Sequence, residues 1–220
     1  ASDFGDLTSL RNQLSGCNDK IRGIWAGGAG PGHGGVNIMD YVTISTTGNG
    51  VDFGNLSAAK TTPASCSSST RGIWNYDAGP VAEMKFVNIR TLGNTTDFGD
   101  GHTASGMNGG QSSSTRVIFA GGYGYKNTID FWTVQSLGNA VDFGDLTDLR
   151  QMMSGCNDKI RGVWAGGRGP GHTGVDTMDY VTIQSTGNAV DFGNLSASKT
   201  TPASCSSSTR GIWNYEWWSK

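Results

Sequence analysis

Short runs of alternating apolar and polar side chains recur along the whole chain. Residues 39–45 (Met-Asp-Tyr-Val-Thr-Ile-Ser) alternate with a period of about two, and residues 22–26 form a short apolar run that stops at a glycine pair. Such patterns are typical of strands bounded by turns. Gly48-Asn49 tolerates positive φ and so predicts a hairpin turn before a strand at 51–53. With a further candidate at 13–17, this stretch contains four short strands.

The four-strand pattern repeats along the chain. Asp-Phe-Gly and a later Arg that opens a strand recur in phase, with spacings of 49, 45, 45 and 49 residues. The Asp-Phe-Gly positions are Asp3, Asp52, Asp97, Asp142 and Asp191, and the Arg positions are Arg22, Arg71, Arg116, Arg161 and Arg210. The repeat units are residues 3–51, 52–96, 97–141, 142–190 and 191–220.

The first two units return later in the chain. Residues 3–51 and 142–190 are identical at 37 of 49 positions, and residues 52–77 and 191–216 at 24 of 26. The last unit is truncated. This order indicates internal duplication of a three-unit block, by natural copying or by construction.

Four antiparallel strands in each repeat of this length form one blade of a β-propeller. We therefore predict an all-β fold in which residues 1–220 form a single five-bladed β-propeller of four-stranded antiparallel blades. The N-terminal strand, within residues 1–8, is expected to close the last blade against the strand that begins at Arg210. We expect a monomer, with blade closure between molecules as the alternative.

The closing blade lacks a third strand. The tail Glu216-Trp217-Trp218-Ser219 resembles Asp130-Phe131-Trp132-Thr133 of a third strand and is a candidate substitute. The other interpretation is an open ring.

The repeat unit resembles a known family. Residues 24–28 (Ile-Trp-Ala-Gly-Gly), followed by Tyr41 and then Phe53, are similar to a kelch repeat, although kelch repeats usually carry Trp where this chain has the Phe of Asp-Phe-Gly. The units more closely resemble kelch-like repeats found in marine-phage structural proteins and uncharacterised viral proteins. The resemblance implies a propeller fold, and it suggests a virion or extracellular location that the sequence itself does not establish.

Composition narrows the function classes. The chain has 35 Gly and 15% charged residues, a net charge of −2 and a pI near 5.9. It therefore lacks the basic surface expected of a nucleic-acid-binding protein. No apolar run is long enough to span a membrane, so we expect neither a nucleic-acid nor a membrane partner.

The sequence shows no catalytic or metal-binding constellation. The cysteines, Cys17, Cys66, Cys156 and Cys205, occupy one repeat position and are expected to be buried free thiols. The repeated acids are expected to pair with the repeated arginines. Glycosidase chemistry needs two carboxyl groups in different environments, which evenly replicated acids do not offer. We predict a protein that is not an enzyme and has no cofactor or metal.

The candidate ligand-binding residues are aromatic or lie in glycine-rich loops. Large aromatics at a repeated position are expected to pack between blades, although such rings can also present flat faces to sugars. The loops at 26–37 and 165–176 vary between units while the strands stay constant, so the face that carries them is the expected binding face. The candidates are Trp25, His33, Tyr41, Trp74, Trp164, His172, Tyr180 and Trp213.

These observations favour a noncatalytic binding module, a lectin-like or virion-appendage propeller that recognises a surface glycan or a protein partner. Several weak, equivalent sites gain avidity when the target is multivalent. The alternatives are a purely structural scaffold protein of a virion and a five-bladed glycoside hydrolase.

Overall fold

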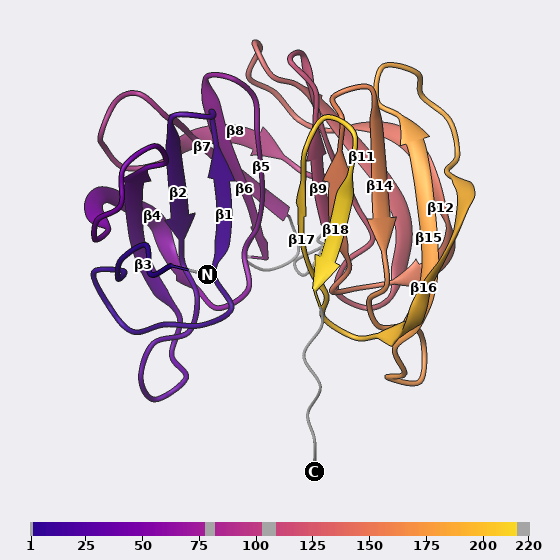
Figure 1. Ribbon diagram of the computed structural model, residues 1–220. Coiled ribbons are helices and arrows are strands. Elements are labelled where there is room, and N and C mark those ends of the chain that lie inside the picture. The colour runs from indigo at the N-terminus through magenta and orange to yellow at the C-terminus, as the bar shows by residue number, and fades with distance from the viewer. Residues whose placement is uncertain (1, 78–81, 103–108, 215–220) are drawn as a thin grey trace.

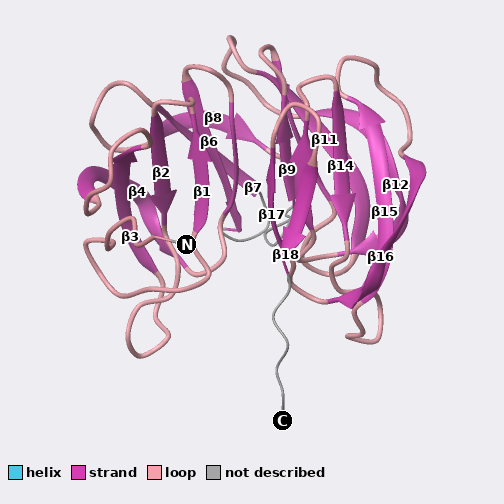
Figure 2. Cartoon of the chain, in the orientation of Figure 1, coloured by secondary structure: helices cyan, strands magenta, loops and turns pink. Residues whose placement is uncertain are grey.

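The computed structural model describes residues 2–77, 82–102 and 109–214, and in this part of the chain every regular element is a β-strand (Figure 2). The strands form four sheets of four strands and one sheet of two. All pairs are antiparallel, and within each four-stranded sheet the strands lie side by side in chain order. None of the described residues forms a helix that could cross a membrane.

The strand bounds follow the repeat. The first sheet contains β1 (Ser15–Asn18), β2 (Arg22–Ala26), β3 (Val36–Thr43) and β4 (Val51–Lys60). The second contains β5 (Ala64–Ser67), β6 (Arg71–Asp77), β7 (Ala82–Asn88) and β8 (Thr96–Asp100). The third contains β9 (Gly109–Ser112), β10 (Arg116–Ala120), β11 (Lys126–Thr133) and β12 (Val141–Arg150). The fourth contains β13 (Ser154–Asn157), β14 (Arg161–Ala165), β15 (Val175–Thr182) and β16 (Val190–Lys199), and the last sheet contains β17 (Ala203–Ser206) and β18 (Gly211–Asn214).

The sheets are arranged as propeller blades. The first strands of successive sheets lie next to one another in the order β1, β5, β9, β13, β17, and the later strands of each sheet lie progressively farther out (Figure 1). In the described part of the chain, β17 makes no comparable contact with β1. The protein is therefore an all-β propeller of four blades, followed by a small fifth sheet.

The prediction of five four-stranded blades closed by the N-terminal strand is wrong. Among the described residues, which end at Asn214, the last repeat unit forms only the two-stranded sheet of β17 and β18. The tail proposed as a substitute third strand, residues 216–219, lies outside the described residues. The N-terminal residues are described, but they bond to the first sheet and form no ladder with β18.

The N-terminal segment, residues 3–12, contacts the first sheet in the way that β12, the fourth strand of the third sheet, contacts the fourth sheet. The N–H groups of Gly48 and Gly50 donate to the carbonyls of Phe4 and Asp6, at 2.8 and 2.6 Å. Gly187 and Ala189 of the fourth sheet donate in the same way to Phe143 and Asp145 of β12. The segment thus covers an edge that would otherwise be exposed.

The apolar core lies between blades. Each of its three clusters of buried residues combines side chains from two neighbouring sheets. Between the first and second sheets, Ile24 and Phe53 meet Trp74 and Ile89, and all four side chains are buried. A single twisted sheet of this size cannot enclose a core by itself, so each blade depends on its neighbour.

The repeated arginines act between blades, which corrects the expectation that they pair with the repeated acids. The Arg22 guanidinium lies 4.8 Å from the centre of the Tyr41 ring and donates at 3.2 Å to the carbonyl of Ile89 in the next sheet. Arg71 and Arg116 repeat this geometry toward Val134 and Ile183. Each arginine therefore ties one sheet to the end of the third strand in the next.

The acids of the third strands have other partners. Asp40 and Asp179, whose side chains are fully buried, form ion pairs with Arg11, at 2.7 Å, and with Arg150. These arginines come from the segment or strand that precedes each sheet, so the pairs also lie between structural units. Burial of both charges is tolerated because the guanidinium also donates to backbone carbonyls.

The fourth strand of the first sheet is longer than predicted: the strand expected at 51–53 continues to Lys60. A register shift at Met39/Asp40 lets the strand bend, and Leu56 returns to the core. The glycine of Asp-Phe-Gly allows the blades to approach closely: a Cβ at Gly54, which has φ +138°, would lie 2.4 Å from the carbonyl oxygen of Gly93 in the next sheet.

We expect Gly54→Ala to be more destabilising than Gly93→Ala, by about 1–3 kcal/mol, because only the first adds a clash to the strain of positive φ. A Cβ at Gly93, which has φ +150°, would have no atom within 4 Å. Chemical denaturation of the two variants measures the difference. Equal losses would show that the close approach between blades is not what requires glycine at Gly54.

Candidate functional site

The tryptophans predicted as ligand-binding residues lie between blades. Trp74 and Trp164 are fully buried, and the Trp164 indole Nε1 donates to the carbonyl of Gly109 at 3.0 Å. Trp25 and Trp213, which belong to the first and last sheets, are half-buried. In the folded chain Trp74 and Trp164 cannot present a ring to a ligand, and the packing interpretation of this position accounts for them.

The predicted tyrosines also lie within the blades. Tyr41 packs edge-to-face against Phe53, and Tyr180 packs in the same way against Phe192, with ring centres 6.0 and 5.9 Å apart. Both tyrosines are half-buried. Their hydroxyl-bearing rings thus belong chiefly to the repeated aromatic stack of the blade.

The two predicted histidines occupy the tips of exposed turns that join the second and third strands. We call the end of the sheets that carries these connections the loop face. His33 follows Gly32 and His172 follows Gly171, and all four residues have positive φ, between 64° and 86°. Two successive left-handed residues form a tight turn that most L-amino acids adopt only at an energetic cost. Both histidines are exposed, and nothing lies within 4 Å of where a Cβ would stand on Gly32 or Gly171.

The third sheet has the same kind of turn, although its loop is shorter. Gly124 and Tyr125 have φ values of +85° and 58°, close to those of Gly171 and His172. The structure therefore brings one ring to the tip of an equivalent turn in the first, third and fourth sheets. The corresponding loop of the second sheet, residues 78–81, lies outside the described residues.

Two of these turns meet across the boundary between the third and fourth sheets. The Tyr125 hydroxyl lies 2.5 Å from Nδ1 of His172, and their rings pack edge-to-face with centres 5.7 Å apart. Tyr123, two residues earlier, is 60% exposed. We call the packed pair of Tyr125 and His172, together with the exposed Tyr123 of the same loop, the ring cluster; it can offer both stacking surfaces and hydrogen bonds at the loop face.

Sequence analysis found both histidines but missed Tyr123 and Tyr125. The shorter loop of the third unit hides the alignment, because Tyr125 lies three residues after its glycine pair while His33 lies five residues after Gly28. The available signal was the dipeptide Gly124-Tyr125, a Gly followed by a residue with a ring, which lies between the second and third strands as Gly32-His33 does. A comparison of the turns themselves, without requiring loops of equal length, finds this signal.

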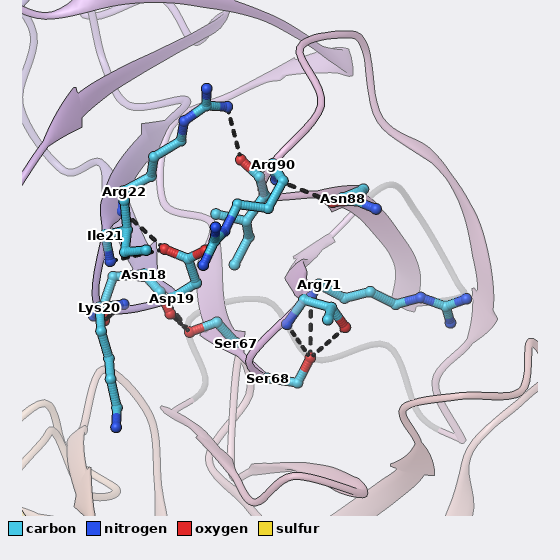
Figure 3. A network of polar contacts seen from close by, with 12 residues as sticks. Asn18, Asp19, Lys20, Ile21, Arg22, Ser67, Ser68, Arg71, Asn88 and Arg90 are labelled. Carbon is cyan, nitrogen blue, oxygen red and sulfur yellow. Dashed lines mark hydrogen bonds and ion pairs between the residues drawn. The ribbon is translucent and has the colours of Figure 1, made fainter.

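A polar network ties the first and second sheets together at the end opposite the loop face (Figure 3). Asp19, whose side chain is fully buried, accepts hydrogen bonds at Oδ1 from the backbone N–H groups of Ile21 and Arg22, at 2.9 and 2.8 Å. Its Oδ2 pairs with Nε of Arg90, which follows the third strand of the second sheet. Burial raises the pKa of Asp19, but these donors outweigh it and the net pKa is lowered.

The fourth sheet has the same turn without such a partner. Asp158 Oδ1 accepts hydrogen bonds from Ile160 and Arg161, at 2.9 and 2.6 Å. Its Oδ2 lies 3.8 Å from Nε of Arg161, and among the described residues no cation from another sheet reaches it. Arg161 likewise has no carbonyl partner there of the kind that Arg22 has.

A cavity of about 420 Å³ occupies this place, between the fourth sheet and β18. Asp158, Arg161, Arg210 and Phe192 line it, together with Trp213. Phe192 is 48% exposed, whereas its counterpart Phe53 is 2% exposed under the second sheet. The cavity therefore marks the part of the interface that the described residues of the last unit do not cover.

The cysteines are free thiols, as expected, but the prediction that all four are buried is wrong for Cys205: only Cys17, Cys66 and Cys156 are buried. Burial raises the pKa of these thiols, which makes them poor nucleophiles. Cys205, in the last sheet, is exposed. Among the described residues no three His, Cys, Asp or Glu side chains gather as a metal site would require.

No protein-family model and no curated protein sequence matches the chain. What the geometry defines is the class of fold, a β-propeller with a ring cluster on its loop face and, within the described part of the chain, an unpaired outer edge on β18.

We expect Asp19→Asn to lower the free energy of unfolding by about 1–2 kcal/mol near neutral pH, because the charged carboxylate holds three donors. Since the folded pKa is lowered from 3.8, this stabilisation is complete above the unfolded pKa and is lost as the pH falls through the folded value. Denaturation of both proteins between pH 2 and 7 should show the difference closing only below about pH 4. The matched Asp158→Asn variant should lose less, and an equal loss would mean that Arg90 adds nothing.

We expect one thiol in the folded protein to react quickly with an aromatic disulfide reagent, and all four in denaturant. Cys205 is exposed, whereas burial protects the other three. Absorbance of the released thiolate gives the count. Cys205→Ser should abolish the fast reaction and Cys66→Ser should keep it; a fast reaction in Cys205→Ser would contradict the uncovered edge.

Proposed function

We propose that the protein is a noncatalytic binding module whose loop face recognises a surface ligand, with a glycan as the first candidate. The observation that carries this proposal is the ring cluster of Tyr123, Tyr125 and His172. Its two central rings stand on left-handed turns from different sheets, and strain of this kind is concentrated at functional sites.

The chemistry of the cluster suits carbohydrate. A sugar ring offers C–H groups that pack on an aromatic face and hydroxyls that exchange hydrogen bonds with a phenol, an imidazole or an amide. Gln151 lies directly beside the cluster, where its side-chain oxygen accepts a hydrogen bond from the backbone N–H of Gly124 at 3.2 Å. Repetition adds weight, because His33 occupies an equivalent turn and several weak sites favour a multivalent target.

The environment of the acids also supports a role other than hydrolysis. Asp40 and Asp179 are fully buried and each forms an ion pair with an arginine, so neither carboxylate is accessible to a substrate. The resemblance of the repeats to kelch-like repeats of phage structural proteins makes a virion appendage the setting we propose for this binding.

A glycan array probed with the labelled protein tests the proposal. We expect several related, multivalent glycans to bind, and Tyr125→Ala to weaken the binding by roughly ten-fold, because it removes the ring and the contact with His172. His33→Ala removes a ring from an equivalent turn, but no described aromatic side chain packs against His33. This variant should therefore weaken glycan binding less than Tyr125→Ala does. Leu137→Ala, at an exposed turn of the opposite face, is the neutral control.

An array without hits would overturn the glycan as ligand. Equal binding by the Tyr125→Ala and Leu137→Ala proteins would remove the ring cluster from the site. Loss of substrate turnover on changing a single acid would instead support a hydrolase.

A further inference from the structure

The last sheet docks on the fourth sheet as the second docks on the first. The hydroxyls of Ser204 and Ser206 donate to the carbonyls of Gly155 and Asn157, at 2.8 and 3.1 Å. Ser65 and Ser67 make the same bonds to Gly16 and Asn18, at 2.8 and 2.7 Å. The inner half of the interface is therefore already formed.

The outer half of this interface has a template in the same chain. β6 pairs with β7, which sets Ile73 opposite Phe86 and Asn75 opposite Met84. β18 carries the same four residues as positions 72–75 of β6, but no strand pairs with its outer edge among the described residues. Ile212, the counterpart of the fully buried Ile73, is 59% exposed.

β7 provides what the cavity lacks. The side chains of Val87 in β7 and of Ile89 just after it are buried against the first sheet. The Ile89 carbonyl accepts a hydrogen bond from Arg22, and the next residue, Arg90, pairs with Asp19. At the cavity, Phe192, Arg161 and Asp158 occupy the places of Phe53, Arg22 and Asp19. The cavity thus presents an apolar wall, an arginine and an aspartate in the order that a β7-like strand would contact, and the arginine and the aspartate have described polar partners only within their own turn.

We propose that the open edge of β18 binds an extended segment of another polypeptide, antiparallel, whose sequence follows the β7 pattern: Val and Ile at alternate positions, then a cation. A backbone ladder to β18 gives this strand addition its affinity, and the side chains give it specificity. Every third strand that the structure describes is already paired within its own sheet, so a second copy of the protein has no such strand to donate without unfolding a blade.

The test uses the full-length chain and a fluorescent peptide of residues 83–90, Glu-Met-Lys-Phe-Val-Asn-Ile-Arg. We expect saturable binding by fluorescence anisotropy and at least ten-fold weaker binding of a peptide with the same residues in scrambled order. Two further peptides, N-methylated at alternate residues, report on the ladder. If the peptide pairs with β18, methylation of the N–H groups that face β18 abolishes binding, whereas methylation of the outward-facing N–H groups leaves binding unchanged.

The charged contacts are tested by a double-mutant cycle between Asp158→Asn in the protein and Arg90→Gln in the peptide. We expect a coupling of roughly three- to five-fold, as for a partly exposed ion pair. Leu137→Asn, away from the cavity, should leave peptide binding unchanged.

Several results would overturn the proposal. Equal binding of the two N-methylated peptides would exclude strand addition. Absence of peptide binding would show that β18 does not accept a β7-like strand. A dimer in light scattering that the peptide dissociates would assign the edge to a second copy instead.

Discussion

Each sheet of this protein can bury its apolar face only against the next sheet, and the rest of the structure depends on that constraint. The core accordingly lies between blades, where Ile24 and Phe53 of one sheet meet Trp74 and Ile89 of the next. The polar contacts follow the same rule, since Arg22, Arg71 and Arg116 each reach a carbonyl of the following sheet. A unit repeated in sequence is thus stabilised mainly by what it shares with its neighbour.

The same constraint explains why the two ends of the chain differ. At the first sheet, residues 3–12 supply the contacts that a preceding blade would make, down to the buried ion pair of Arg11 and Asp40. At the last sheet β17 and β18 supply only the inner half of the next interface. Phe192, Cys205 and Ile212, whose counterparts in the second unit or the first sheet are buried, are exposed at this edge.

The repeat made most of the fold predictable. The Asp-Phe-Gly motif and the repeated Arg recur with the same spacings and so define the repeat unit. Turn residues such as Gly48-Asn49 limit where a strand can end, and they predict the four strands of each unit. The number of complete blades was not predictable in this way. The repeated Arg indicates the second strand of a unit, but it does not show that a third strand pairs with it. The repeated arginines were assigned to the wrong partners. The repeat shows where a side chain lies within its own unit, but it does not show which atoms of the next sheet that side chain contacts. Of the ring cluster only His172 was predicted, because the turn that carries Tyr125 has the same conformation as the turn of His172 but lies in a loop of different length.

The two-stranded last sheet has a consequence for how the molecule opens. An array in which each unit is held by its neighbours unfolds more readily from a unit with one neighbour than from a unit with two. The sheets in the middle of the chain are held from both sides, whereas among the described residues β17 and β18 make their main contacts with β13 on one side. Local opening should therefore be graded along the described chain, with the least free energy needed at β17 and β18, and this sheet can fray while the other blades remain intact.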